Sequence, residues 1–352
     1  MKGWAKAMTN NKWYTVNNEE ADVVVSSRVR LARNLRDLPF PRRMTPEQRR
    51  ELCGRVSKAI DAGKFTGGLA FSKLDMGKLT NEQVLSLVER HCISPEFAQE
   101  REGRLLLLSA DESVSVMVGE EDHLRIQVIS ANKNLASCME LANQLDDLLD
   151  EQLEFAFDEK LGYLTQCPTN LGTGLRASVM LHLPALEQTG AAAKLAANVQ
   201  KLGLTLRGTY GEGSKAQGSL YQLSNQVTLG ISEEAAVQNL SGIAQQIIDQ
   251  ERRARKALAE QPNLCDAIWR AYGVLRYCRS LSSEEFIKYL SFVRLGAALG
   301  YFEQLDFAAL DTLLYTAGAG SIMAAQRRQM SPAQRDTARA EMVRQALAGS
   351  AA

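Results

Sequence analysis

Short stretches in which apolar and polar residues alternate constrain the fold of this chain most strongly, because several of them carry arginine at the polar positions. In a β-strand, successive side chains point to opposite faces, so the apolar residues can face a core while the arginines share the other face. We therefore predict a sheet with two unlike faces. Its apolar face would hold Val29, Leu31, Leu124, Ile126, Leu175 and Val179, and its cationic face Arg28, Arg30, Arg125, Arg176 and Arg207.

A face that carries five arginines favours an anionic ligand, because like charges repel one another unless an anion lies between them. The forked donors of a guanidinium match phosphate oxygens in a bidentate manner. We therefore expect the triphosphate of a nucleotide at this face. The alternative is that each arginine is a separate, solvated residue on the outer face of a half-buried sheet.

Composition limits the classes of protein to which the chain can belong. Its 352 residues are enough for two domains, and 41 Lys and Arg residues balance 41 Asp and Glu residues. Nucleic acid is disfavoured as a partner, since such proteins carry a surplus of positive charge. No apolar run approaches the length of a membrane span and the N-terminus lacks the core of a secretory signal, so we expect a cytoplasmic protein without a membrane partner. The six cysteines form no Cys-x-x-Cys pair, which argues against a zinc site and a disulfide framework.

The predicted elements change in character near residue 232. Before it, strands and turns alternate with helices, and residues 105–130 predict three strands with short turns, which indicates antiparallel pairing. After it, nearly everything predicts helix. We expect an α+β fold with an antiparallel sheet flanked by helices in residues 1–260, and an all-α domain in residues 261–352. The predicted helices begin at Thr45 and Thr80 or cover residues 136–155, 186–201, 232–259, 263–279, 282–298 and 331–346.

The common sequence motifs of phosphate-binding loops are missing. The chain has no Gly-x-x-x-x-Gly-Lys-Ser/Thr segment, no Gly-x-Gly-x-x-Gly loop after a strand, and no His-Arg-Asp and Asp-Phe-Gly pair. If a nucleotide binds, arginine side chains must hold it.

Five segments occur in the order found in the phosphagen (guanidino) kinases, which this chain resembles over residues 20–230. They are residues 26–30, 120–125, 167–177, 207–209 and 224–225. The resemblance implies an ATP:guanidino phosphotransferase whose catalytic domain has the guanidino kinase fold, which is like that of glutamine synthetase. It also implies that Mg²⁺ arrives with ATP, so no metal site of the protein itself is expected.

The resemblance assigns roles to particular residues. It makes Ser27 and the five arginines ATP-binding residues, Glu121 the catalytic carboxylate and Cys167 the reactive cysteine beside the guanidinium. The chemistry agrees, because an acceptor guanidinium has a pKa above about 12 and must be aligned and deprotonated before it attacks phosphorus. We predict that Glu121 and Glu212 hold its two edges. The alternative for Glu212 is an exposed loop carboxylate, and for Cys167 a buried apolar cysteine.

The adenine contact is left open by the sequence. Met180 stands four residues after Arg176, where the family has an adenine-contacting histidine, and His182 follows two positions later. We therefore predict that Met180 or His182 contacts the base.

Two departures from the small-molecule phosphagen kinases bear on the acceptor. Only 25 residues precede Ser26, where those kinases have a helical domain, and the chain continues into a helical region after residue 260. In both respects it resembles the bacterial protein-arginine kinases of the McsB type. In that subfamily an Arg-Asp-x-x-Arg-Ala motif belongs to a phosphoarginine-binding site, which assigns this role to Arg335, Asp336, Arg339 and Ala340. The alternative is a solvated helix face.

The resemblance implies that the protein phosphorylates arginine residues of other proteins and marks them for a Clp-type chaperone-protease in the stress response. An activator protein, a homodimer formed through the helical domain and autophosphorylation are expected with it. Two alternatives stay open: a metabolic kinase that acts on a small free guanidine, and a catalytically weak adaptor that binds phosphoarginine. The presence of Glu121, Glu212 and Cys167 argues against the adaptor. The sequence names neither targets nor activator.

Overall fold

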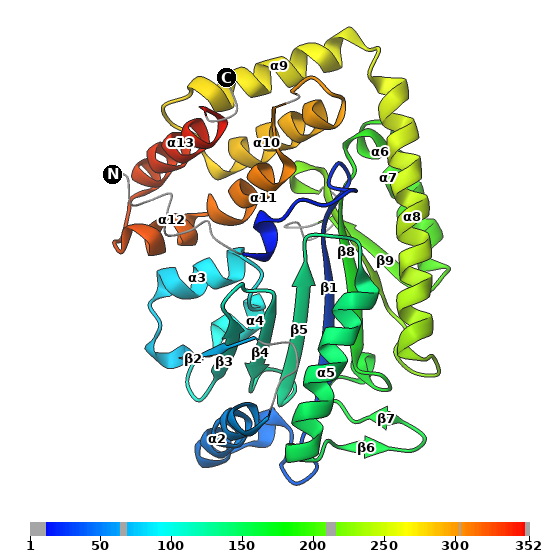
Figure 1. Ribbon diagram of the computed structural model, residues 1–352, viewed down its shortest axis with the longest axis vertical. Coiled ribbons are helices and arrows are strands. Elements are labelled where there is room, and N and C mark those ends of the chain that lie inside the picture. The colour runs from blue at the N-terminus through cyan, green and yellow to red at the C-terminus, as the bar shows by residue number, and fades with distance from the viewer. Residues whose placement is uncertain (1–11, 64–68, 209–215, 303, 349–352) are drawn as a thin grey trace.

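The computed structural model describes residues 12–63, 69–208, 216–302 and 304–348. Its centre is an eight-stranded sheet in the order β2-β3-β4-β5-β1-β8-β10-β9 (Figure 1), and every neighbouring pair is antiparallel. The predicted antiparallel sheet is thereby confirmed. The strands are β1 (Val24–Arg33), β2 (Phe71–Asp75), β3 (Leu105–Ser109), β4 (Val114–Val118), β5 (Leu124–Ser130), β8 (Leu175–His182), β9 (Leu204–Gly208) and β10 (Leu220–Asn225), and a small hairpin is formed by β6 (Phe157–Asp158) and β7 (Gly162–Tyr163).

One face of the sheet is apolar and covered by helices. The six residues predicted for it are at most 1% exposed, and they share one core with the inner sides of the covering helices. Helices begin where the sequence indicates, since Thr45 closes a capping box at the start of α2. The covering helices are α2 (Pro46–Ala62), α5 (Leu135–Leu153), α6 (Pro184–Gln188), α7 (Ala191–Gln200) and α8 (Glu233–Leu258).

The opposite face is covered only in part. Beside β3 and β4, the helices α3 (Asn81–Glu89) and α4 (Pro95–Gln99) bury Leu106, Leu108 and Met117. At the upper end in Figure 1, a second apolar cluster includes Ile129 and Met180 and lies beneath α11 (Phe307–Thr316). The middle of this face lies between these two clusters, and there the arginines are found.

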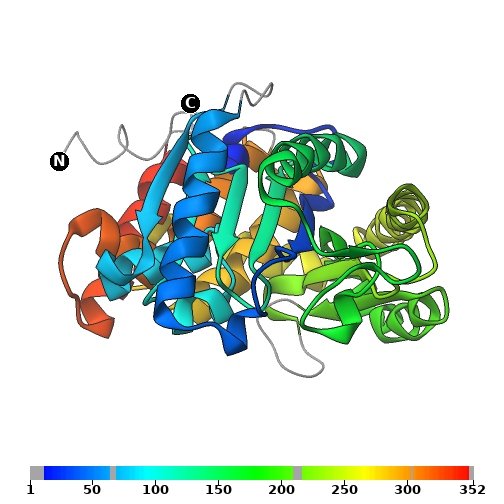
Figure 2. The same cartoon turned by 90° about the horizontal axis from the view of Figure 1, so that it is seen from below.

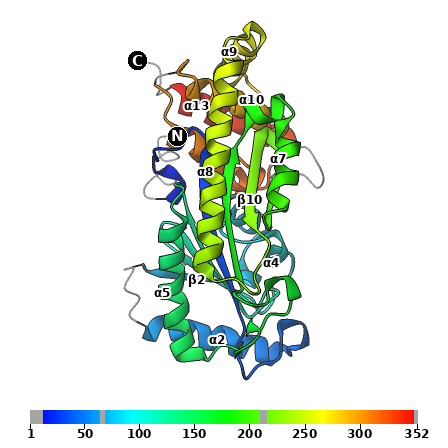
Figure 3. The same cartoon turned by 90° about the vertical axis from the view of Figure 1, so that its right-hand side faces the viewer.

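The chain ends in a group of helices with a core of their own. They lie at the upper end of the sheet, where α10 and α13 are level with the upper part of α8 and α9 extends above it in the side view (Figure 3). A capping box of Ser282 and Glu285 begins α10, as predicted, and Gly318 separates the last turn of α11 from α12. The group consists of α9 (Pro262–Tyr277), α10 (Ser283–Ala298), α11, α12 (Ala319–Gln326) and α13 (Pro332–Ala348).

The single helix predicted for residues 186–201 is wrong. The structure has two helices there, α6 and α7, separated by Thr189 and Gly190. Gly190 adopts a φ of 70°, a left-handed conformation that glycine takes without strain and that ends a helix.

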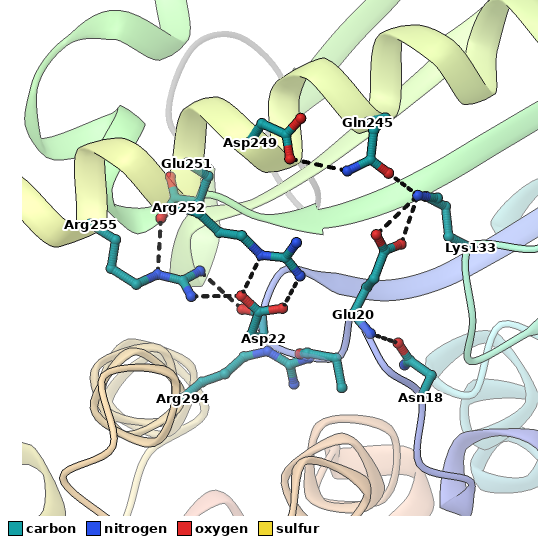
Figure 4. A network of polar contacts seen from close by, with 11 residues as sticks. Asn18, Glu20, Asp22, Lys133, Gln245, Asp249, Glu251, Arg252, Arg255 and Arg294 are labelled. Atoms are coloured by element: carbon teal, nitrogen blue, oxygen red, sulfur yellow. Dashed lines mark hydrogen bonds and ion pairs between the residues drawn. The ribbon is translucent and has the colours of Figure 1, made fainter.

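A polar network fastens the segment before β1 to two distant helices (Figure 4). Asp22 accepts hydrogen bonds from Arg252 at 2.7 Å and from Arg255 at 2.9 Å, both on α8. From α10, Arg294 donates to the carbonyl of Ala21 at 2.6 Å. Arg255 and Arg294 are each 4% exposed, so these cations depend on their partners for stability. The network therefore holds the N-terminal end of β1 against both α8 and the C-terminal helices.

Among the described residues, no single helix has the length and apolar composition of a membrane span. Only α11 and α12 taken together meet that test, and they are bent by 80° where they join.

Candidate active site

The strand register places all five arginines on one face of the sheet. Arg30 lies directly opposite Arg176 across β1 and β8, and Arg28 lies opposite Ser178. Arg125 is paired with Ala32, which has the same orientation as Arg30 on β1. On the outer strands, Arg207 is paired with Gln222, which in turn is paired with Met180 of β8. Paired residues in neighbouring strands point to the same side, so the cationic face predicted from the alternation exists.

The charges on this face are close enough to affect one another. Burial lowers the pKa of the Arg30 guanidinium well below its ordinary value, and its cationic neighbours act in the same direction, in the order Arg28, Arg125 and Arg176. Burial also lowers the pKa of Arg176, followed by the effects of Arg207 and Arg125. The Nε atom of Arg30 is buried and has no hydrogen-bond partner within the described part of the chain. We call these five side chains the arginine cradle; it has unmet donors and excess positive charge that an anion would satisfy.

Two carboxylates follow one another in the turn between β4 and β5. Glu120 is 6% exposed, pairs with Arg125 at 2.6 Å and accepts a hydrogen bond from the hydroxyl of Ser94. Glu121 lies farther from the same guanidinium, at 3.8 Å, and its side chain is 37% exposed. Burial raises the pKa of Glu121, and Asp122 raises it further, against the opposing effect of Arg125. Glu120 thus neutralises Arg125, whereas Glu121 remains available to a ligand.

Glu121 opens into a cleft of about 530 Å³ at this end of the sheet. The cleft is lined by cations of the cradle, Arg30 and Arg125, and by Gln166, the residue before Cys167. A phosphate held by the cradle and a cation held by Glu121 would therefore meet within one cleft.

Asp122 ties this turn to the loop that carries Cys167. Its Oδ1 accepts hydrogen bonds from the Asn34 side chain and from the Gln166 backbone N–H, both at 2.7 Å. Asn34 in turn accepts from the backbone N–H of His123 at 2.8 Å. The Cys167 sulfur lies 3.0 Å from the Thr169 hydroxyl and is partly exposed. Asp122 and Asn34 therefore fix Glu121 relative to Cys167.

Two further predictions concern Glu212 and Ser27. Glu212 lies outside the described residues. Ser27, predicted to bind ATP, is wrong on geometric grounds: it is fully buried and is paired with Val179, which belongs to the apolar face. Because side chains alternate along a strand, the neighbour of Arg28 must point away from the cradle.

Neither Met180 nor His182 is open to a nucleotide. Met180 is 5% exposed and its sulfur accepts from the hydroxyl of Tyr315 on α11 at 3.8 Å. His182 is 1% exposed and its Nε2 lies 2.8 Å from the Ser291 hydroxyl on α10. The prediction that one of them contacts adenine does not fit this structure, because the C-terminal helices cover both.

His91, which the sequence reasoning did not single out, lies beside the cradle. Burial lowers its pKa to about 3, followed by the effects of Arg28 and Arg30, so a neutral ring lies beside the cradle. Its backbone carbonyl accepts from the Gln127 side chain at 2.8 Å, which fixes it to β5. His91 follows α3 with a φ of 59° and belongs to no recognisable motif, so only its place in the fold identifies it.

The Arg-Asp-x-x-Arg-Ala motif lies at the start of α13, but its arginines do not act together as predicted. Arg339 is 1% exposed and donates to the carbonyls of Ala317 and Leu281 at 2.8 and 2.7 Å, and to Asp336 at 2.7 Å. Its guanidinium is therefore occupied by the protein itself, and Ala340 is fully buried. Arg335 and Asp336 remain partly exposed. The expected grip of a phosphate by Arg335 and Arg339 together is not present in this structure.

No group of three or more His, Cys, Asp or Glu side chains that could hold a metal ion exists among the described residues.

An antiparallel sheet that carries an arginine cradle beside a carboxylate defines a class of phosphate-transferring enzymes. Residues 51–254 match the family model described as ATP:guanido phosphotransferase, C-terminal catalytic domain, and residues 261–352 match that of the protein-arginine kinase McsB C-terminal domain. The chain belongs to the ATP:guanido phosphotransferase family and is a kinase, and the second match places it in the McsB branch.

Curated relatives extend over nearly the whole chain. A protein-arginine kinase of Symbiobacterium thermophilum is 44% identical over 354 residues, which cover 98% of this chain and 99% of that protein. A protein-arginine kinase of Moorella thermoacetica is 45% identical over 343 residues, covering 97% and 98% of the two chains.

Solved structures agree on the fold. A lombricine kinase superimposes with a TM-score of 0.59 at 27% identity, covering 72% of this chain and 71% of that one. The duplicated taurocyamine kinase from Schistosoma mansoni, with bound transition state analog components, gives 0.60 at 24% identity over 79% and 41% of the two chains, which supports the fold alone.

Proposed function

We propose that this protein transfers the γ-phosphate of ATP to the guanidino group of arginine residues in other proteins. The observation that carries the proposal is the convergence of the arginine cradle and Glu121 on one cleft. The relatives described above, which are named protein-arginine kinases, match this chain over both of its parts.

The cradle would hold the triphosphate of ATP. Arg30 is its central member, because three other cradle arginines affect its pKa and its Nε lacks a partner. The neutral ring of His91 lies beside Arg28 and Arg30 and is our candidate for a nucleotide contact in place of Met180 and His182. Mg²⁺, carried by ATP, would supply further charge neutralisation when bound.

The acceptor chemistry requires a proton acceptor. As a guanidinium nitrogen forms its bond to the γ-phosphorus, the bond from that phosphorus to the bridging oxygen breaks and ADP leaves with its electron pair. The proton of the attacking nitrogen passes to the carboxylate of Glu121. Cys167 would stabilise the guanidinium from the neighbouring loop, and Glu212 is the proposed second carboxylate. Catalysis then consists mainly of positioning and charge stabilisation.

The direct test is to incubate the protein with ATP, Mg²⁺ and an unfolded acceptor protein, and to measure acid-labile phosphate on arginine. We expect the acceptor protein to be labelled far more efficiently than free arginine. Labelling of free arginine alone would favour a metabolic kinase for a small guanidine. Binding of phosphoarginine without any transfer would favour an adaptor.

We further propose that the biological setting follows the McsB type. The protein would act in the cytoplasm as a homodimer, undergo autophosphorylation, respond to an activator protein and mark targets for a Clp-type chaperone-protease in the stress response. Residues 1–260 would form the catalytic domain and residues 261–352 the phosphoarginine-binding domain, with Arg335 and Asp336 as its accessible residues. The separate match of residues 261–352 to the McsB C-terminal model supports this division.

As the pH is lowered, the rate of transfer should begin to fall at a higher pH than it would with a glutamate of ordinary pKa. Glu121 must be ionised to accept a proton, and its pKa is raised by burial and by Asp122. Below the raised pKa, kcat/KM for the acceptor should drop about tenfold per pH unit. Stopped assays across the acidic range, with circular dichroism to verify folding, measure this limb. A midpoint at or below about 4.3, the value for an unperturbed glutamate, would refute the assignment.

Asp122 should act as a positioning residue that works through one oxygen. Asp122→Ala removes the acceptor of both the Asn34 and Gln166 hydrogen bonds, so we expect kcat to fall at least about tenfold while the KM for ATP changes little. Asp122→Asn keeps an oxygen in the same place and should retain most of the activity. Equal losses of kcat in the two variants would show that the charge of Asp122, and not its two hydrogen bonds, is needed.

A further inference from the structure

We propose that the polypeptide on one side of the acceptor arginine lies in a groove that continues from the active-site cleft, between α2 and residues 100–105. This inference rests on the proposed function and identifies the surface by which a protein substrate would be held.

The groove, which we call the side groove, is a second cleft of about 780 Å³. It is formed by one side of α2, by residues 100–105 and, at its far end, by Asp75 and Gly77. Arg49, Glu100 and Arg104 line both this groove and the cleft that contains Glu121. The two hollows therefore adjoin along a common wall beside α2. This helix crosses the front of the molecule in the view from below (Figure 2).

The walls of the side groove are preformed. The Cys53 thiol of α2 donates to the carbonyl of Gly103 at 3.4 Å, which joins the helix to the facing loop. Arg104 is 7% exposed and donates to the carbonyls of Glu96 and Phe97 at 3.1 and 3.0 Å. Its Nε is buried and has no partner within the described part of the chain. A ligand would thus meet a fixed wall.

The charges of the two hollows suit different parts of a substrate. The carboxylates of the active-site cleft, Glu96, Glu100, Glu120 and Glu121, lie among arginines and can hold a guanidinium. The side groove carries charges of both signs, and on its α2 side Arg49 and Arg50 can donate to carbonyl or carboxylate oxygens. The side chain of Arg50 is 66% exposed and that of its partner Glu47 is 73% exposed. Such a surface pair contributes little, so a substrate oxygen can replace it readily.

An extended polypeptide is the occupant that uses both hollows at once. A free guanidine fills only the active-site cleft and leaves the side groove without a role. A peptide with arginine in the cleft and carbonyl or acidic groups beside it can reach Arg49 and Arg50 along the common wall. We therefore assign the side groove to the segment next to the acceptor arginine.

Charge reversal on α2 tests the assignment. Arg50→Glu changes the side groove, whereas Lys58→Glu makes the same charge change at an exposed position of the same helix that does not line it. The acceptors are a peptide of about ten residues, which spans roughly 33 Å when extended, with one arginine and adjacent aspartates, and acetyl-arginine amide. We expect Arg50→Glu to lower kcat/KM for the peptide about tenfold, the equivalent of one lost charge contact of about 1.4 kcal/mol. Lys58→Glu should leave it within about twofold, and neither variant should affect the amide or the KM for ATP beyond that margin.

Equal effects of the two variants on the peptide, or equal effects of Arg50→Glu on peptide and amide, would overturn the side groove as a substrate site. A second measurement does not depend on activity. Photo-crosslinking from p-benzoylphenylalanine at position 50 should capture an unfolded acceptor protein, and the same probe at position 58 should not. If the wild type phosphorylates acceptor proteins but the probe at position 50 captures none of them, the side groove is refuted and the proposed function stands. Wild-type protein that phosphorylates no protein refutes the proposed function and the groove with it.

Discussion

Glu121→Gln should lower kcat by about a thousandfold and leave the affinity for ATP nearly unchanged. General base catalysis by a positioned side chain contributes factors of roughly 10²–10⁴, and glutamine has nearly the same shape without the ability to accept the proton. Nucleotide binding should survive because Arg125, the nearest cradle residue, has a closer carboxylate partner in Glu120, at 2.6 Å against 3.8 Å for Glu121. The guanidinium of Arg125 therefore stays in place when Glu121 loses its charge.

Single-turnover phosphorylation and calorimetric titration with ATP measure the two quantities separately. Glu140→Gln, which changes an exposed carboxylate on α5, is the control and should behave like wild type. If Glu121→Gln kept more than about a tenth of the wild-type rate, another group would have to accept the proton, and Glu121 would lose its assigned role.

Arg30→Met should make the free protein more stable and at the same time weaken its binding of ATP. Arg30 is held among like charges, and burial together with Arg28, Arg125 and Arg176 lowers its pKa. Replacing such a cation with an apolar side chain of similar length removes repulsion and desolvation, which is expected to stabilise by about 1 kcal/mol or more. The same change removes a charged contact to the triphosphate worth about 1.5–3 kcal/mol, or roughly 10- to 100-fold in Kd.

Thermal unfolding with and without Mg-ATP makes both effects visible in one experiment. Wild type should gain thermal stability from the nucleotide, whereas Arg30→Met should start from a higher Tm and gain much less. Arg270→Met removes an exposed arginine of α9 and should change neither value, since that side chain is 77% exposed. If Arg30→Met had a lower Tm than wild type and still gained as much Tm from ATP, the cradle would not be an anion site whose cations repel one another.

The cradle is the part of the site that the sequence predicts best. Alternation with a period of two depends only on local backbone geometry, so Arg28 and Arg30 can be assigned to one face before the strand partners are known. The same rule excludes Ser27, although it belongs to the segment that resembles the guanidino kinases. A motif conveys which segment matters, whereas the alternation conveys which side chains of that segment can act.

Contacts between distant segments explain the remaining differences. Met180 and His182 lie on a strand near the cradle, but α10 and α11, which cover them, follow more than a hundred residues later. The polar sequence around Arg339 predicts a surface residue, yet its guanidinium donates to the carbonyls of Ala317 and Leu281, which only the folded chain brings near. Burial, followed by Arg28 and Arg30, lowers the pKa of His91, and no sequence spacing points to these neighbours. Each of these properties arises from tertiary packing, which local patterns do not encode.

The bond network around Asp22 has a practical consequence for dissecting the protein. A fragment cut near residue 260 would lose Arg294 from beneath the carbonyl of Ala21, and it would expose Met180 and His182 to water. The strand that bears Arg28 and Arg30 begins two residues after Asp22. Loss of the contacts at Asp22 would therefore displace the arginines of the cradle. Inactivity of a shortened chain would consequently reveal a loosened scaffold and would say nothing about whether the missing helices take part in catalysis.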